Sequence, residues 1–385
     1  MNNKVLIILG AGKAQIPIIE TAKKLDYFVI AIDRNQESRG FKIVDKKIII
    51  STYDSKTVVD ELIKLKDKYN YKYIGVIART SGPALYTAAA ISETFGLPGL
   101  MAEIVPLATE KSTFRNFCRE KDIPVPKGEK VELSNFIETK CDFPVIVKPD
   151  LPIIGKEAVK LITDRDKLDQ AVQLASDASY NGVVEIEEFI EGFDIGCLFI
   201  INRNTSSIIA YWDEMVGIKK NGEIIGCGVS VPSVIKGTTI ENKVKIIVEK
   251  FTKSLSSDVE AILILAFRID LNGDPNIIEL HADLGGDLIA EDLFPISDPH
   301  FDYFKSCIHI ATKNYNHVPI PNFTPSAIIY KNIFRQPEPS DRITEVIESF
   351  SVIDLHKKII DKLNRNKKEF LFMPNHFNIV SQIYS

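Results

Sequence analysis

The sequence predicts a fold of mixed class, α/β at the N-terminus and α+β beyond it, arranged in two or three domains. Three observations predict it. The 385 residues exceed what a single typical core accommodates. Over about the first hundred residues, short apolar runs alternate with helical patterns, as they do in parallel βαβ units. Beyond them, several expected strands follow one another, and two apolar strands flank an Asn-Gly-Asp-Pro turn of the kind found in hairpins.

The N-terminal elements form a βαβαβα series. Residues 4–9 are a continuous apolar run, which suits a strand buried on both faces, and a helical pattern follows over 15–25. The other expected elements are strands at 28–32, 48–50 and 73–78 and helices near 55–68 and 83–95. This alternation predicts a parallel sheet with right-handed crossovers, a Rossmann-like domain that we place at residues 1–105.

A glycine pair follows the first expected strand. Gly10 and Gly12 precede Asp33 by about twenty residues, a spacing found in dinucleotide-binding turns. The third glycine position of that motif is Gln15, however, and the rest of the chain offers no hydride chemistry. We therefore favour a tight strand-to-helix turn that is structural, or that contacts a different substrate, over nicotinamide or flavin binding.

The pattern changes after this first domain. A helical pattern opening at Lys111 leads to a proline-rich break at 123–126, which forces extended backbone. After it we expect strands at 143–148, 158–162, 183–190, 196–202 and 207–213 and helices at 164–176, 239–254 and 302–314. We place a second domain at residues 106–315, with a smaller subdomain at about 125–190. The weak patterning of residues 316–385 predicts a small C-terminal subdomain whose fold it does not define.

Composition and charge narrow the class of protein. A net charge of −5 gives no extended basic surface for nucleic acid or anionic lipid. No apolar run reaches the roughly 18 residues of a membrane span, and the N-terminus lacks the small-residue cleavage site of a signal peptide. The five cysteines are scattered without a Cys-x-x-Cys pair, which indicates reduced thiols. We expect a cytoplasmic protein that binds neither nucleic acid nor membrane.

The most informative stretch holds two apolar strands around an Asn-Gly-Asp-Pro turn. If the turn is centred between Asp274 and Pro275, then Asp270 lies opposite Glu279. In that register the two flanking polar residues, Arg268 and His281, also lie opposite one another. Because side chains alternate along a strand, all four polar side chains project from one face, and the apolar residues point to the other.

Two carboxylates, a cation and an imidazole on one face suit a metal-bridged phosphate better than a core. Calcium sites collect more oxygen ligands from one compact loop, whereas Mg²⁺ takes one or two carboxylates and completes its shell with water and nucleotide phosphates. Lys148 ends an apolar strand immediately before Pro149, where its ammonium can meet a phosphate. A strand edge that can bind an adenine is also present. ATP with Mg²⁺ is therefore the expected ligand.

Four motifs in order resemble the ATP-grasp superfamily, specifically the carboxylate–amine ligase branch similar to carbamoyl-phosphate synthase and L-amino-acid ligases. The resemblance spans roughly residues 1–315. The motifs are Lys111 at its helix start, Phe-Pro-Val-Ile-Val-Lys148-Pro, Glu-Glu-Phe-Ile-Glu-Gly-Phe-Asp194, and Arg268-Ile-Asp270 with Glu279-Leu-His281. The resemblance implies an ATP-grasp fold after the first domain, in which two α+β subdomains clasp ATP.

The resemblance also implies roles for the phosphate end of the site. Lys111 and Lys148 would approach the ATP phosphates, Lys148 also lying near the adenine. Asp270 and Glu279 would hold Mg²⁺, with Glu279 bridging two ions. Arg268 would stabilise charge on the transferring phosphoryl group or on the later tetrahedral intermediate.

At the nucleoside end, the resemblance implies that Glu187 and the backbone of Glu188 and Ile190 hydrogen-bond the adenine edge. Asp194 would accept from the ribose hydroxyls. The implied reaction is phosphorylation of a carboxylate by Mg-ATP, followed by attack of an amine on the acyl phosphate to give an amide, ADP and phosphate. The carboxylate and amine would be small molecules such as amino acids, and a homodimer is expected from the family.

Three positions depart from the family pattern. His281 stands where the last motif, Glu-x-Asn, has its asparagine; neutral imidazole is a poorer ligand for Mg²⁺ than an amide oxygen, and softer metals favour it more. Mn²⁺ is the alternative to Mg²⁺ as the expected ion. Asp283 stands where many relatives have an arginine. The loop after Lys148 lacks the usual serine and glycine, and Lys156 could supply charge there. The alternatives that stay open are another ATP-grasp enzyme, such as an ATP-dependent carboxylase, and a non-catalytic ATP-binding module.

Overall fold

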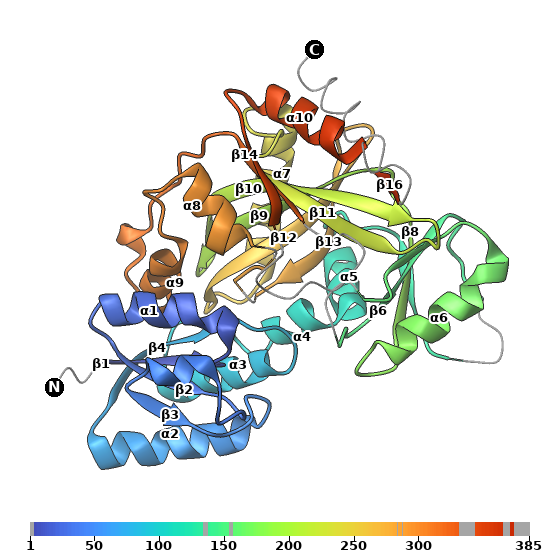
Figure 1. The fold of residues 1–385 in the computed structure, drawn as a ribbon. Coiled ribbons are helices and arrows are strands. Elements are labelled where there is room, and N and C mark those ends of the chain that lie inside the picture. Colours follow the sequence, from blue (N-terminus) through green and yellow to red (C-terminus); the bar gives the residue numbers. More distant parts are fainter. Residues whose placement is uncertain are drawn as a thin grey trace.

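The computed structural model describes residues 4–133, 138–153, 157–282, 284–286, 288–330, 343–364 and 370–372. In this part of the chain the strands form a parallel sheet and two antiparallel sheets (Figure 1). The predicted mixture of α/β and α+β architecture is confirmed.

The N-terminal sheet is the predicted parallel sheet. Its strands are β1 (Lys4–Leu9), β2 (Phe28–Ile32), β3 (Lys46–Ile48) and β4 (Lys72–Ala78), in the order β3-β2-β1-β4. The helices that cover it are α1 (Ile16–Lys24), α2 (Ser55–Tyr69) and α3 (Ala84–Phe95). Leu6 and Ile8 face α1, whereas Val5 and Ile7 face α2 and α3. The continuous apolar run of β1 is thus buried on both faces, as a parallel central strand requires.

The loop after β1 is held by local contacts. The Asp33 carboxylate accepts the amides of Ala11 (2.8 Å) and Asn35 (2.9 Å), and the Gly40 amide donates to the Ala11 carbonyl at 2.8 Å. Gly10 has a φ of +89°, which favours glycine. Because the Asp33 carboxylate is engaged by backbone amides, these contacts favour the structural interpretation of the glycine turn.

The small antiparallel sheet follows two short helices, α4 (Ile104–Thr109) and α5 (Lys111–Glu120). Its strands are β5 (Gly128–Val131), β6 (Val145–Pro149), β7 (Lys160–Ile162) and β8 (Val184–Glu188), in the order β5-β8-β6-β7. Val145, Val147 and Ile186 pack against α6 (Leu168–Asp177). Because side chains alternate, the opposite face of this sheet carries the polar residues of β6 and β8.

The large sheet is antiparallel throughout its described strands, in the order β13-β12-β9-β10-β11-β14-β15, with β16 pairing on β10. The strands are β9 (Gly192–Asn202), β10 (Thr205–Lys219), β11 (Ile224–Val231), β12 (Glu260–Asp270), β13 (Pro275–His281), β14 (Ser326–Tyr330), β15 (Ile343–Glu348) and β16 (Phe370–Phe372). The sequence patterns did not predict β11. The predicted division into domains stays a prediction, but β14 and β15 extend this sheet.

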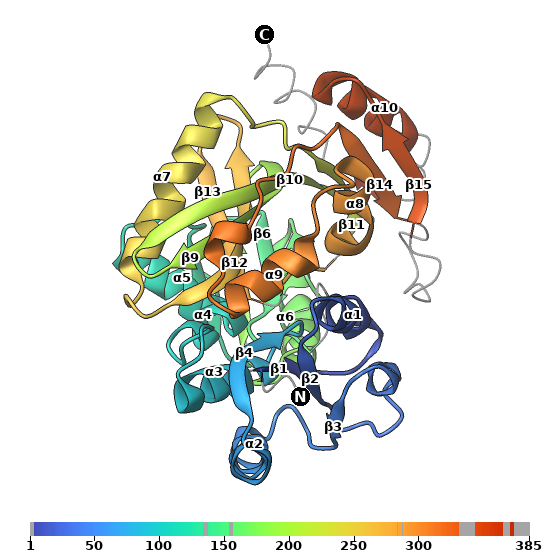
Figure 2. The same ribbon diagram turned by 90° about the vertical axis from the view of Figure 1, so that its left-hand side faces the viewer.

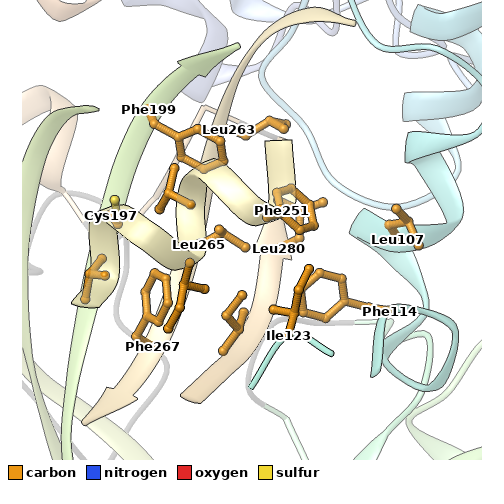
Figure 3. Close-up of a cluster of buried hydrophobic side chains, with 14 of the residues drawn as sticks. Leu107, Phe114, Ile123, Cys197, Phe199, Phe251, Leu263, Leu265, Phe267 and Leu280 are labelled. Carbon is orange, nitrogen blue, oxygen red and sulfur yellow. The ribbon is translucent and has the colours of Figure 1, made fainter. Parts of the chain in front are cut away.

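Helices cover both faces of the large sheet (Figure 2). They are α7 (Thr239–Ser254), α8 (Phe294–Ser297), α9 (Tyr303–Ala311) and α10 (Val352–Asn364). Figure 3 shows Leu263, Leu265 and Phe267 of β12 in one cluster with Phe251 of α7 and Phe114 of α5. Residues 262 and 264 of the same strand pack instead in the cluster that contains α9. None of the helices in the described residues combines the length and apolarity that a bilayer crossing requires.

The cysteines lead to a simple prediction of thiol reactivity. Cys118, Cys197, Cys227 and Cys307 are buried, and only Cys141 is half-buried. Burial raises the pKa of Cys118 and of Cys307 to about 12, so the reactive thiolate is scarce at neutral pH. We expect Ellman's reagent at pH 8 to modify at most Cys141 in the native protein, and slowly, because burial raises its pKa as well. Denaturation should expose all five thiols. Fast modification of two or more thiols in the native protein would contradict this packing.

Candidate functional site

The N-terminus of α5 is fixed to the small sheet by Asp150, the residue after β6. The Asp150 carboxylate, which is 1% exposed, accepts the Ser112 amide at 2.7 Å and the side chain of Asn181 at 2.8 Å. The Asp150 carbonyl accepts the Lys111 amide at 3.1 Å. A carboxylate is favourable there because it satisfies amides at a helix start and meets the positive end of the dipole. These contacts fix where Lys111 begins its helix.

Lys148 lies on the polar face of the small sheet. Its Nζ donates to Glu187 Oε1 at 2.6 Å, and the lysine is 3% exposed. An ammonium so deeply buried requires a carboxylate partner, because an unpaired buried charge costs several kcal/mol. The predicted phosphate lysine and the predicted adenine residue are therefore in direct contact.

A second buried pair lies beside the first. Arg115 and Glu185 form a salt bridge, and both are almost fully buried. Burial lowers the pKa of Arg115. Neither residue was predicted as part of the site, although the sequence carries a signal for both. Arg115 stands four residues after Lys111, on the same helix face, and Glu185 stands two before Glu187, on the same strand face.

The predicted register of the β12–β13 hairpin is wrong. In the structure Arg268 lies opposite Asn276, and a shift between Ala266 and Phe267 then places Ala266 opposite Glu279. The turn is closed by residues 270 and 274, whose backbones hydrogen-bond at 3.0 Å, and Gly273 within it has a φ of +74°. The turn thus comes earlier than predicted, and the bulge adds one residue to β13. Arg268, Glu279 and His281 nevertheless project from the same face of the hairpin, as the alternation of side chains predicted.

Asp270, one of the predicted metal ligands, lies at the turn of the hairpin. Its Oδ1 accepts the amides of Asn272 at 2.9 Å and Asp274 at 2.8 Å, so the carboxylate holds the turn. Its expected metal partner, Glu279, pairs with Ala266 across the hairpin. In the described residues there is no group of three or more His, Cys, Asp or Glu side chains that could hold a metal ion. The structure therefore does not group Asp270 with the other two predicted metal ligands, Glu279 and His281, which contact each other.

Glu279 is held between two basic groups. Its Oε2 lies 3.2 Å from Lys111 Nζ, and its Oε1 lies 3.0 Å from His281 Nε2. Burial would raise the pKa of Glu279, but Lys111, then His281 and Lys148, hold that pKa well below its usual value. Glu279 is therefore ionised, and the charge of Lys148 reaches it as well.

Arg268 is bound to the nucleoside end of the site. Its Nε and Nη2 bind both oxygens of Asp194, Nη2–Oδ2 at 2.8 Å, and its Nη1 donates to the Ile190 carbonyl at 2.9 Å. The guanidinium carbon lies 5.7 Å from the centre of the Phe189 ring. Burial opposes its charge, but Asp194 raises the pKa of Arg268 above its usual value. The guanidinium of Arg268 was expected at the phosphoryl group. It is paired instead with Asp194, the carboxylate that was predicted to bind the ribose.

The remaining predicted groups also have partners. The Glu188 amide donates to the Lys127 carbonyl at 2.8 Å, and Glu188 Oε1 accepts the Lys127 amide at 2.8 Å. Lys156 and Asp283 lie outside the described residues. The structure thus brings Lys111, Lys148, Glu187, Asp194, Arg268, Glu279 and His281 into contacting pairs, and sets Asp270 apart from them.

Comparison with known proteins gives distant relatives. No family model matches the chain. The chain is 26% identical over 212 residues to the carbamoyl phosphate synthase large chain of Clostridium acetobutylicum, which covers 50% of this chain and 19% of that one. It is 26% identical over 222 residues to the formate-dependent phosphoribosylglycinamide formyltransferase of Prochlorococcus marinus, covering 54% and 53%. The matches thus span about half, or less, of the length of these curated relatives.

Solved structures match over most of the chain. The L-amino acid ligase from Bacillus licheniformis superposes with a TM-score of 0.66 at 18% identity, over 86% of this chain and 80% of that one. The N5-carboxyaminoimidazole synthetase from Staphylococcus aureus, complexed with ADP, gives 0.68 at 14% identity, over 93% and 96%. The biotin carboxylase domain dimer of Hydrogenobacter thermophilus 2-oxoglutarate carboxylase, in complex with MgADP, gives 0.67 at 15% identity, over 98% and 94%. The chain therefore has the ATP-grasp fold, as its four motifs predicted.

Proposed function

We propose that this protein is an ATP-dependent carboxylate–amine ligase. The observation that carries the proposal is a pair of lysines from different elements, one partly buried and one fully buried, each held by a carboxylate. Lys111 of α5 contacts Glu279 of β13, and Lys148 of β6 contacts Glu187 of β8. Lys148 also lowers the pKa of Glu279, so the two pairs share one electrostatic environment. Two ammonium groups that converge in this way fit a polyphosphate.

The donor set fits the organic part of a nucleotide. Glu187 offers carboxylate oxygens near Lys148, and the Asp194 carboxylate is oriented by Arg268 for ribose hydroxyls. Arrival of the phosphates would give each lysine a second anionic partner. The complexes of the S. aureus and H. thermophilus proteins with ADP support this assignment.

The donor set does not fit the expected pair of Mg²⁺ ions. A divalent cation would neutralise phosphate charge and orient the phosphoryl group. The described residues supply one carboxylate, Glu279, and one imidazole, His281, whereas the position opposite Glu279 is Ala266. We therefore assign no step of the reaction to a two-metal site.

The proposed reaction has two steps. An oxygen of the substrate carboxylate attacks the γ-phosphorus of ATP while the bond from that phosphorus to the β–γ bridging oxygen breaks, and ADP leaves. The nitrogen of a neutral amine then attacks the acyl carbon. The bond from this carbon to the phosphate-bearing oxygen breaks, phosphate leaves, and the nitrogen loses a proton to give the amide. In both steps the protein contributes positioning and fixed positive charge from Lys111 and Lys148.

We propose a small carboxylate such as an amino acid as the substrate, a choice supported by the superposition on the L-amino acid ligase. We also propose a homodimer, which the H. thermophilus dimer supports. A second candidate is a nucleotide-binding module without turnover. One observation favours it, namely that Ala266 stands opposite Glu279, where a second metal carboxylate would be needed.

Release of ADP separates the two candidates. The chain is incubated with ATP and either Mg²⁺ or Mn²⁺, first with each amino acid alone and then with pairs. A ligase releases ADP in amounts that rise when the second amino acid is added, with an equal amount of phosphate. Tight nucleotide binding without amine-dependent ADP release from any pair would instead support the non-catalytic module.

Arg268 is expected to tune selectivity for the ribose. The guanidinium of Arg268 binds both oxygens of Asp194. Arg268→Met should therefore leave this carboxylate free to rotate away from the ribose. We expect the preference for ADP over 2′-deoxy-ADP to fall on the order of tenfold, the worth of a charged hydrogen bond. Equilibrium binding of both nucleotides measures it, with Arg203→Met, an exposed arginine, as the control. An unchanged preference in Arg268→Met would show that Asp194 does not contact the ribose.

A further inference from the structure

The small sheet and the large sheet are joined where the β10–β11 hairpin ends. The tip of this hairpin, residues 219–224, reaches β7, the edge strand of the small sheet (Figure 1). The Leu161 amide donates to the Gly222 carbonyl at 2.8 Å. The Ile224 amide donates to the Val159 carbonyl at 3.1 Å. Strands of the two sheets are thus linked by backbone hydrogen bonds.

This link closes a ring of backbone that includes the predicted nucleoside residues. From Glu187 in β8 the chain continues through residues 189–191 into β9, where Asp194 pairs with Glu214 of β10. Strand β10 leads to the hairpin tip, the tip pairs with β7, β7 pairs with β6, and β6 pairs with β8. All other links of the ring are continuous strand pairings or the chain itself. The contact between the tip and β7, an isolated bridge, is the shortest pairing in the ring.

The predicted nucleotide contacts are inaccessible while this ring is closed. Lys148 is 3% exposed, Glu187 7% and Arg268 8%, so a nucleotide reaches them only if the two sheets separate. At one side of the small sheet, the buried salt bridge between Arg115 and Glu185 attaches β8 to α5. At the opposite side, the hairpin tip holds β7. Separation therefore opens at the tip and pivots at β8.

We propose that the pairing of the hairpin tip with β7 is the gate of the nucleotide site, and that its opening sets the rates of nucleotide uptake and release. This inference rests on the proposed function, because it assumes that the nucleotide binds between the two sheets. Gating by a small, weakly held contact is physically reasonable, because opening it disrupts few hydrogen bonds and leaves the rest of both sheets intact.

The tip is shaped for this contact by its own residues. The Gly222 amide donates to the Lys219 carbonyl at 2.9 Å, and Lys219 Nζ lies 2.9 Å from Glu223 Oε1. Gly222 has a φ of +82°, and a side chain at this position would collide with the carbonyl oxygen of Leu161. Glycine is therefore required for the close approach of the tip to β7.

Gly222→Ala should weaken the gate, because the added methyl group displaces the tip from β7. We expect release of ADP to become about tenfold faster, the effect of losing one or two backbone hydrogen bonds. Gly237→Ala is the matched control, because Gly237 has a φ of +81° but no described atom beyond its chain neighbours within 4 Å of an added Cβ. The full chain is loaded with radiolabelled ADP and diluted into excess unlabelled ADP, and the retained label is followed by filtration.

A reversible cross-link tests the gate in the opposite direction. Lys160 and Glu223 face each other in the isolated bridge, between the two hydrogen bonds. The Cα atoms of such a pair are typically about 4.5 Å apart, within the range that a disulfide spans. In the double variant Lys160→Cys with Glu223→Cys, oxidation before ADP is added should prevent uptake, and oxidation after loading should trap the nucleotide. Dithiothreitol should reverse both effects, and titration of free thiols confirms that the cross-link has formed.

The outcomes distinguish the gate from the proposed function. Equal release rates in Gly222→Ala and Gly237→Ala would overturn the gate, as would uptake and release that the cross-link leaves unchanged. Either result would leave the ligase proposal standing, because ADP still binds. Absence of ADP binding by the unchanged protein would overturn both. The pair of glycine variants decides the question by itself if the disulfide does not form.

Discussion

Lys148→Ala is expected to weaken nucleotide binding strongly. The lysine is buried beside Glu187, where its ammonium would contact phosphate, and a charged hydrogen bond of this kind contributes about 1.5–3 kcal/mol. The affinity for ADP should fall by roughly ten- to a hundredfold. The measurement is equilibrium binding of ADP by calorimetry.

A loss of folding must be separated from a loss of binding. Lys148→Ala alone leaves Glu187 buried without its partner, which costs stability as well. The double variant Lys148→Met with Glu187→Gln removes both charges and keeps the volume, so it should fold but still not bind ADP. Lys130→Met, at an exposed lysine of the same sheet, is the control. Binding of ADP by the double variant with unchanged affinity would show that the nucleotide lies elsewhere.

Asp213→Ala is expected to have the largest effect on stability. Asp213 lies fully buried in β10 and accepts hydrogen bonds from Ser233 Oγ at 2.5 Å and from the Val234 amide at 3.1 Å. His356 Nε2 of α10 contacts its Oδ2 at 3.0 Å. The substitution leaves these buried groups without their acceptor, and each buried polar group left unsatisfied costs about 1–3 kcal/mol.

Urea unfolding, followed by fluorescence, measures this loss. The only tryptophan of the chain, Trp212, is the neighbour of Asp213 in β10 and packs against Phe294, so its emission reports on the large sheet. The unfolding midpoint should move to markedly lower urea in Asp213→Ala and stay in place in Asp258→Ala, an exposed aspartate. A midpoint that is equal in both variants would contradict the stabilising role of this network.

Much of the fold could be predicted because it depends on local pattern. The apolar run of β1 indicated a strand buried on both faces, and the helices between strands indicated parallel pairing. Lys148 could be singled out because a charged residue ended an apolar strand. In each case the order of apolar and polar residues along a short stretch of chain carried the information.

The register of the β12–β13 hairpin could not be predicted from the local pattern of apolar and polar residues. Alternation assigns side chains to faces, which is why Glu279 and His281 share theirs. It does not reveal which residues close the turn or where a bulge adds a residue. Here the Asp270 carboxylate caps the turn and the bulge follows Ala266, so the cross-strand partner of Glu279 changed from a carboxylate to a methyl group.

Contacts between distant segments were also beyond sequence patterns. Asp213 and His356 are 143 residues apart, and neither stands in a motif. Arg268 illustrates the same limit within the site, since only the pairing of β9 with β12 places it beside Asp194. The roles of these residues depend on tertiary packing, which propensity and alternation do not encode.

The most direct test of the ligase proposal is interception of its acyl phosphate. Hydroxylamine can replace the unknown amine, so the chain is incubated with ATP, Mg²⁺ or Mn²⁺, hydroxylamine and each of a panel of amino acids and other small carboxylates. The proposal predicts that at least one carboxylate yields its hydroxamate together with an equal amount of ADP, and that the Lys148→Met, Glu187→Gln double variant yields neither. ADP binding by the unchanged protein without hydroxamate from any carboxylate would contradict the proposed ligase.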